Sequence, residues 1–177
     1  MKITKTLISL MTLGFIFGCT SSIDPKIYTK NSPKFDIRSY LNGPLEAHGI
    51  LQNRSGEVIK TFSVKMVGSW VGNDGVLKED FVFSDGKTDQ RTWEIKVLDD
   101  NNFTAKAHDT VGSAKGLQYG NAMKMNYVLK IDVDGKKYDI SLVDWIYLVD
   151  EKTAINVSAM TKFGFRVGTL TISFKKL

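Results

Sequence analysis

The sequence predicts an all-β protein, a single antiparallel up-and-down β-barrel of about nine or ten strands preceded by a cleaved signal peptide. Three observations lead to this prediction. Turn-forming residues recur at intervals of roughly 8 to 15 residues from Leu45 to the end of the chain. Apolar and polar residues alternate between these turns, and no segment there keeps a helical period over three turns.

The first element of the chain is a secretory signal. Lys2 and Lys5 precede an apolar run from Leu7 to Phe17, which is followed by Gly18. A short basic region, an apolar run and a small residue are typical of a signal peptide. The run is too short for a membrane span, which needs about 20 residues. We therefore expect residues 1–18 to be removed.

The end of the signal resembles the lipobox of bacterial lipoproteins, through the sequence Ile16-Phe17-Gly18-Cys19. The resemblance implies that Cys19 is lipidated, with acyl chains such as palmitate, and becomes the new N-terminus. Thr20, rather than Asp, follows it, which implies sorting to the outer membrane of a Gram-negative envelope, facing the periplasm. The alternative is an ordinary signal peptide or an N-terminal membrane anchor with an incidental cysteine.

The rest of the chain is expected to be a tether and one domain. Residues 19–34 contain two of the three prolines and are predicted to be a flexible lipidated tether. Residues 35–177 are predicted to form the barrel, with a short helix or plug between Pro33 and Leu41. Without the signal, 22 Lys and Arg face 19 Asp and Glu, a net charge of +3. These charges are scattered, so a nucleic-acid partner is not expected.

The alternation assigns inward faces to the strands. It is clearest from Ala122 to Val133, where every second residue is apolar. A closed barrel would also leave no exposed strand edge. The expected apolar lining consists of Phe62, Met66, Trp70, Phe81, Trp93, Met123, Met125 and Tyr127.

Five charged residues share the inward phase: Glu79, Arg91, Asp109, Asp144 and Arg166. An isolated buried charge is costly, so these groups should pair, solvate a cavity or meet a ligand. Three interpretations stay open: a polar cluster in a pocket, a structural ion-pair network, and charges at the barrel rim.

Catalysis is less well supported than binding. Glu79, Asp109 and Asp144 could supply a glycosidase-like carboxylate pair, but the sequence does not fix their separation. The two histidines, His48 and His108, lie on separate strands, and no spacing indicates a metal site. Nucleophile elbows, phosphate loops and dinucleotide fingerprints are also missing from the sequence, so we expect neither a metal nor a cofactor.

Several motifs resemble a family of proteobacterial lipoproteins, the domain-of-unknown-function family 3833. They are the segments 35–43 and 79–86, the Arg91-x-Trp93 pair, the glycine-rich segment 112–122, Asp144-Trp145 and Lys162-Phe163-Gly164. The resemblance covers nearly the whole chain after the signal, in order. It implies a lipocalin-like barrel and supports the lipid anchor, but it carries over no activity and no catalytic residue.

The leading functional hypothesis is a lipoprotein that binds a lipid-like or amphipathic small molecule in its barrel. The apolar lining would hold an acyl chain, and Arg91 or Arg166 would meet its carboxylate or phosphate. One alternative is a structural or envelope-assembly lipoprotein that binds no small molecule and meets a partner through an exterior apolar patch. A barrel interior filled by side chains would favour this alternative. The other is a carboxylate-based enzyme.

Overall fold

The structure, a computed structural model, describes residues 23–133 and 135–177. The predicted signal peptide and Cys19 therefore lie outside the described residues. The elements are η1 (Pro25–Tyr28), α1 (Ile37–Tyr40), β1 (Gly43–Asn53), β2 (Val58–Val71), β3 (Asp74–Phe83), β4 (Thr88–Val97), β5 (Asn102–Lys106), β6 (Ala114–Tyr119), β7 (Ala122–Val133), β8 (Lys136–Leu148), β9 (Thr153–Lys162) and β10 (Phe165–Lys176).

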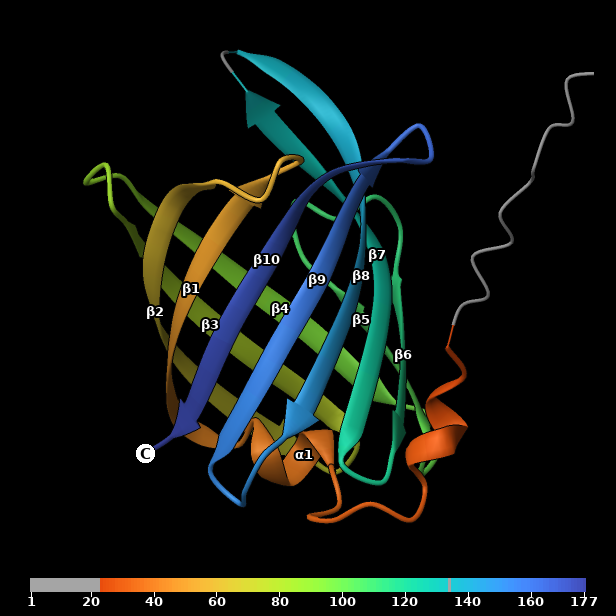
Figure 1. The fold of residues 1–177 in the computed structure, drawn as a ribbon. Helices are drawn as coiled ribbons and strands as arrows, with labels where there is room; N and C mark the ends of the chain where they lie inside the picture. The colour runs from red at the N-terminus through yellow and green to blue at the C-terminus, as the bar shows by residue number, and fades with distance from the viewer. Residues whose placement is uncertain (1–22, 134) are drawn as a thin grey trace, which may run out of the picture.

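The ten strands form one closed antiparallel barrel (Figure 1). Each strand pairs with its neighbours in sequence, and β1 also pairs with β10, from Leu45↔Lys176 to Asn53↔Gly168. Closure leaves no free first or last strand. The predicted all-β, up-and-down barrel is confirmed. All ten strands of the closed barrel lie within residues 23–177, so this part of the chain forms the barrel without a strand from elsewhere.

The helix α1 closes one end of the barrel, the lower end in Figure 1. Asp36 caps it by accepting a hydrogen bond from the backbone N–H of Arg38 (2.8 Å), and Ile37 and Leu41 are buried. Gly68 of β2 lies against the backbone carbonyl of Leu41, where a Cβ atom would overlap the oxygen. The short helix expected between Pro33 and Leu41 is therefore the floor of the barrel.

The described part of the expected tether, residues 23–34, packs against the outside of the barrel. Pro25 is buried, and the ring of Tyr28 meets Trp145 and Tyr147 edge-on at 5.9 and 5.5 Å between centroids. Lys124 donates to the backbone carbonyl of Ile23 (3.3 Å). The prediction of a flexible tether is wrong for these residues. Proline content indicated a linker, but the apolar contacts of Pro25 and Tyr28 hold the segment on the wall.

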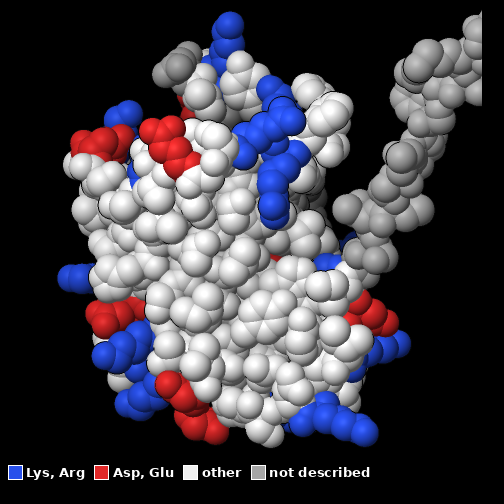
Figure 2. All heavy atoms as spheres, in the orientation of Figure 1, with Lys and Arg blue, Asp and Glu red and all other residues white. Residues whose placement is uncertain are grey.

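The outer surface is unevenly charged. Charged side chains point outward from β3 and β4, such as Lys78, Asp80, Glu94 and Lys96, whereas the outward residues of β8 to β10 within 143–147, 155–159 and 169–173 are uncharged. Figure 2 shows this pale wall, with Lys and Arg gathered toward the open end above it. None of the helices in the described ranges is long and apolar enough to cross a membrane.

The close contact between Gly68 and the backbone of Leu41 predicts that a larger residue at position 68 destabilises the barrel. Gly68→Ala should lower the free energy of unfolding by about 2–3 kcal/mol, because the new Cβ meets a fixed backbone carbonyl. Urea unfolding followed by circular dichroism would measure this loss. Ser69→Ala, on the next and outward residue, should change stability by less than about 0.5 kcal/mol. Equal effects of the two substitutions would contradict the close contact.

Candidate functional site

A cavity of about 570 Å³ occupies the barrel interior. It extends from Ile37 and Leu41 at the floor to Lys130 and Asp132 near the end of β7. Its volume lies within the range usual for small-molecule sites. The side-chain-filled interior considered as an alternative is therefore wrong. Most of the wall is apolar, with Val64, Met66, Leu77, Phe81, Phe103, Met123, Met125, Leu142, Leu170 and Ile172 among its members.

Arg91 of β4 lies at the centre of a polar cluster in this cavity. Its guanidinium forms a forked pair with Asp109, with Nε–Oδ2 at 3.1 Å and Nη2–Oδ2 at 2.7 Å. Its Nη1 lies 3.7 Å from Oε2 of Glu79. The guanidinium also lies over the rings of Phe81 and Trp93, at 5.5 and 5.7 Å from their centroids. The donors of Arg91 are thus largely engaged by the protein itself.

The pair of Arg91 and Asp109 spans a weak part of the wall. On its β5 side, β4 pairs only from Glu94 to Val97, so its residues 88–93 have no strand beside them there. Residues 107–113 fill this place as a loop, joined to β7 by the Thr110↔Leu129 bridge and by Lys130 N–H donating to Asp109 O (2.8 Å). The ion pair ties this loop to β4.

Glu79 of β3 is held deep in the cavity, with 11 % of its side chain exposed. Its Oε2 accepts a hydrogen bond from Trp93 Nε1 (3.2 Å) and faces Arg91. Burial nevertheless dominates and raises the pKa of Glu79 to about 7, with the charges of Asp109 and Asp144 adding to the shift. Glu79 is therefore a carboxyl group that takes up a proton near neutral pH.

Asp144 of β8 anchors a second polar group. Tyr127 O–H donates to its Oδ2 (3.0 Å), and Ser158 Oγ lies at hydrogen-bond distance from its Oδ1. Ser158 Oγ is also 2.9 Å from Oδ1 of Asn156, whose Nδ2 donates to the carbonyl of Trp145 (3.2 Å). Burial raises the pKa of Asp144 to about 6, although Ser158 and Tyr127 oppose the shift.

The proton count in this group favours a neutral Asp144. The hydroxyl of Ser158 has one proton and cannot donate to both Asp144 and Asn156. If Asp144 carries a proton, it donates to Ser158, which donates to Asn156, which donates to Trp145 O, and every contact is satisfied. If Asp144 is ionised, two oxygens face each other without a proton. The hydrogen-bond geometry and the raised pKa of Asp144 both favour its protonated form.

Six of the eight residues predicted to bind a ligand line the cavity: Glu79, Arg91, Trp93, Asp109, Tyr127 and Asp144. The strand pairing of β7 and β8 runs without a shift through Met125↔Asp144, which keeps Asp144 on the inward face of β8. Among these charges, Arg91, Asp109 and Glu79 form an ion-pair network that faces the cavity, which combines two of the three interpretations left open.

Arg166 does not reach the cavity. A register shift between Arg166 and Gly168 in the pairing of β10 with β9 adds one residue, Val167, to β10. This bulge reverses the phase before Gly168, so Arg166 pairs with Thr161 and is exposed. The inward prediction for Arg166 is wrong because it extended an unbroken alternation through a bulge.

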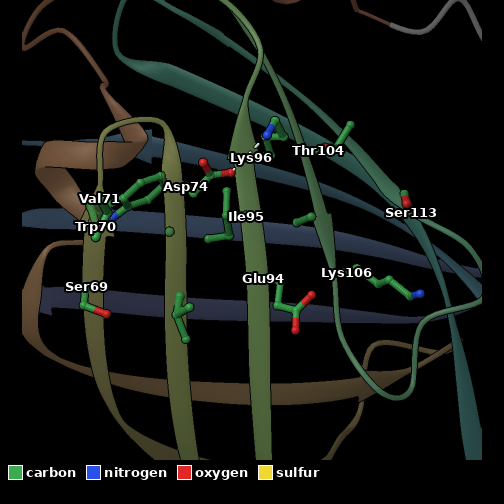
Figure 3. A pocket seen from close by; sticks show the side chains of 13 residues that line it. Ser69, Trp70, Val71, Asp74, Glu94, Ile95, Lys96, Thr104, Lys106 and Ser113 are labelled. Carbon is green, nitrogen blue, oxygen red and sulfur yellow. Dashed lines mark hydrogen bonds and ion pairs between the residues drawn. The ribbon is translucent and has the colours of Figure 1, made fainter.

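Trp70 also lies away from the cavity. Its ring covers Gly75 at the closed end, and it borders a shallow outer groove with Asp74 and Lys96 (Figure 3). Because Gly68 already contacts the floor, the next inward position on β2 lies beyond that floor. Trp70 is therefore not a lining residue.

Sequence reasoning missed the two polar lining residues of β9, Asn156 and Ser158, both of which are buried. Their outward neighbours Ile155 and Val157 are more apolar than they are, so the alternation of β9 points the wrong way. Only the pairing with β8, which places Ser158 opposite Asp144, reveals their position.

The site has no metal-ligand set. No group of three or more His, Cys, Asp or Glu side chains suited to a metal occurs within residues 23–133 and 135–177. Glu79 and Asp109 both face Arg91 rather than an open cleft between two carboxyls. The arrangement offers hydrogen-bond acceptors and a closed apolar wall, which suit binding.

Fold and site together define a class of protein: a closed antiparallel β-barrel, plugged at one end, with a ligand-sized cavity. The chain belongs to the family described as "Protein of unknown function (DUF3833)", whose model matches residues 13–176. The family resemblance noted in the sequence is thus confirmed. Comparison with curated proteins finds no match.

Two solved structures share the fold. The S-type phycobiliprotein lyase CPES from Guillardia theta is 7 % identical, with a TM-score of 0.59, over 88 % of this chain and 99 % of that one. A DUF3598-family protein of unknown function from Nostoc punctiforme PCC 73102 is 13 % identical, with a TM-score of 0.57, over 82 % of this chain and 51 % of that one. At such low identity the likeness concerns the fold alone.

The raised pKa values of Glu79 and Asp144 predict that the barrel loses stability as pH rises. Each carboxyl binds its proton more tightly when folded, so their contribution is complete below about pH 4 and is lost as pH rises through about 6 and 7. Glu79→Gln should reduce this fall by on the order of 2 kcal/mol, measured by urea unfolding at pH 5 and pH 8.

Asp80→Asn is the matched control, because Asp80 is the exposed neighbour of Glu79 on the same strand. It should leave the pH dependence unchanged. A wild-type barrel equally stable at both pH values would show that Glu79 is not a raised-pKa group.

Proposed function

We propose that this protein is an envelope lipoprotein whose barrel binds one amphipathic small molecule, with the apolar part along the wall and a polar end at the Glu79–Arg91–Asp144 cluster. The observation that carries the proposal is the cavity of about 570 Å³, which is plugged at the floor and mostly apolar but has polar groups around Arg91 and Asp144. Such a combination of an apolar wall and few convergent polar groups is typical of binding sites.

The charges of the cluster select the polar end of the ligand. Asp109 accepts hydrogen bonds from Nε and Nη2 of Arg91, so the charges of these two side chains already cancel each other. Among the described residues, Arg91 is the one cation that lowers the pKa of Glu79 and Asp144, and a ligand carboxylate or phosphate would raise these pKa values further. This argues against Arg91 as an anion anchor. A hydroxyl, amide or protonated amine would instead donate to Glu79, whose Oε1 receives no hydrogen bond from the described residues.

The cellular address of the protein is part of the proposal and rests on the sequence. The signal-like start and the lipobox-like Ile16-Phe17-Gly18-Cys19 support a lipid anchor at Cys19. Thr20 supports the periplasmic face of the outer membrane. An anchored barrel would meet amphipathic molecules at the membrane surface, which suits the proposed ligand class.

One observation favours a second candidate, a structural or assembly lipoprotein. The middle of the outer face of β8 to β10 carries uncharged outward residues over three adjacent strands, seen as the pale area in Figure 2. Such a face would suit a protein partner. The two candidates separate in the binding experiment below, because a partner-binding wall does not need the cavity.

Displacement of the neutral dye Nile red from residues 23–177 tests the proposal. We expect dodecylamine and dodecanol to displace the dye at least tenfold more effectively than dodecanoate at pH 8. The preference should shrink at pH 5, where Glu79 and Asp144 are protonated. Equal or stronger displacement by dodecanoate at pH 8 would contradict the proposed polar end.

A cavity-filling substitution tests the position of the ligand. Met125→Trp places a larger side chain on the lining and should weaken dye binding at least tenfold, because the added ring occupies ligand volume. Asn126→Trp, on the next and outward residue, is the matched control and should bind as the wild type does. Unchanged binding in a folded Met125→Trp barrel would place the ligand elsewhere and favour the structural candidate.

A further inference from the structure

The open end of the barrel exposes large apolar side chains on two hairpins. At the tip of the β9–β10 hairpin, Phe163 is 88 % exposed and Phe165 is 69 % exposed. Val133, at the tip of the β7–β8 hairpin, is 50 % exposed. Figure 1 shows both hairpins at the end opposite α1. Phenylalanine is usually buried, so two such exposed rings at one turn point to an interaction.

Phe163 occupies a backbone position that disfavours it. Its φ is 51°, and Gly164 follows with φ 81°, as in a type I′ hairpin turn. Asn, Asp or Gly normally takes the first of these positions, and a bulky side chain there is an outlier. An aromatic ring is therefore kept at the tip against the preference of the turn. Outliers of this kind concentrate at functional sites.

Cationic side chains accompany the exposed rings. The segments 128–140 and 159–168 contain five Lys and Arg and three Asp. Lys130 and Asp139 pair with each other at 2.7 Å. The remaining cations of the two hairpins are Lys136, Lys137, Lys162 and Arg166.

Contacts within the rim hold these cations beside the exposed rings. The Nζ of Lys162 lies 3.6 Å from the ring centroid of Tyr138 on β8, which links the two hairpins. Below them, the outward residues of β8 to β10 within 143–147, 155–159 and 169–173 are uncharged, so this part of the wall separates the rim cations from Lys175 and Lys176 at the closed end. The cavity lining reaches Lys130 and Asp132 at the same end.

We propose that this rim, formed by Phe163, Phe165 and Val133 with Lys136, Lys137, Lys162 and Arg166, docks the open end of the barrel onto an anionic lipid bilayer. Exposed aromatic rings enter the boundary between headgroups and acyl chains, and the lysines and arginine meet anionic headgroups. Docking in this orientation places the mouth of the cavity on the membrane surface. A molecule could then pass between bilayer and barrel without crossing water.

Vesicle co-sedimentation of residues 23–177 tests the docking, since this part closes its own barrel and has no lipid anchor. We expect binding to vesicles of phosphatidylglycerol and phosphatidylcholine at 3:7, at least fivefold weaker binding to pure phosphatidylcholine, and a loss of binding between 50 and 500 mM NaCl. Absence of binding to the anionic vesicles at 50 mM NaCl would overturn the proposal. So would binding that ignores both lipid charge and salt.

Phe163→Asn is the decisive variant, because it removes the ring while supplying a residue that the turn prefers. We expect its thermal midpoint to rise and its vesicle binding to fall at least threefold, a combination that misfolding cannot produce. Lys136→Glu/Lys137→Glu should weaken binding to anionic vesicles at least fivefold. The charge-matched control, Lys34→Glu/Lys152→Glu, alters exposed lysines outside the rim and should change binding less than twofold.

Unchanged vesicle binding in Phe163→Asn, or an equal loss in the control, would overturn docking through the rim. Nile red binding in solution keeps this result separate from the ligand proposal. The rim variants should bind the dye as the wild type does, whereas failure of the ligand proposal would show as weak dye binding in the wild type itself.

Discussion

The forked pair between Arg91 and Asp109 is the interaction on which the site depends. It sits where the barrel wall is weakest, between a stretch of β4 without a strand beside it and the loop 107–113 that fills the gap. The same guanidinium faces Glu79 and stacks over Phe81 and Trp93, so it fixes the polar cluster to the apolar wall. Removing one partner of such a buried pair leaves an uncompensated charge, which is far more costly than losing the pair as a whole.

This pair also limits what the cavity can accept. With Arg91 neutralised by Asp109, the protonation of Glu79 and Asp144 decides the net charge of the interior. An interior that is neutral at pH 5 and becomes acidic as pH rises through about 6 and 7 disfavours an anionic ligand. The lipid-like ligand suggested by the apolar lining therefore needs a polar end that donates hydrogen bonds, which is the opposite of a fatty-acid carboxylate.

The sequence was sufficient to predict the barrel, its approximate strand number and the short plug, because alternation and turn spacing are local properties. It also placed Glu79, Asp109 and Asp144 inside. It failed where one residue changes the phase, as at the bulge before Gly168, and where a strand has its more apolar face outside, as in β9 with Asn156 and Ser158. The pairing of Arg91 with Asp109 joins a strand to a loop, and strand phase alone cannot predict which groups meet across such a gap.

Native mass spectrometry of the protein purified from its own envelope can establish whether the barrel carries a ligand. We expect one bound small molecule per barrel, released by denaturation, with an apolar body and a neutral or cationic polar end, and absent from the Met125→Trp variant. A barrel that carries no molecule, or one that carries a fatty acid or phosphate ester in wild type and variant alike, would contradict the account.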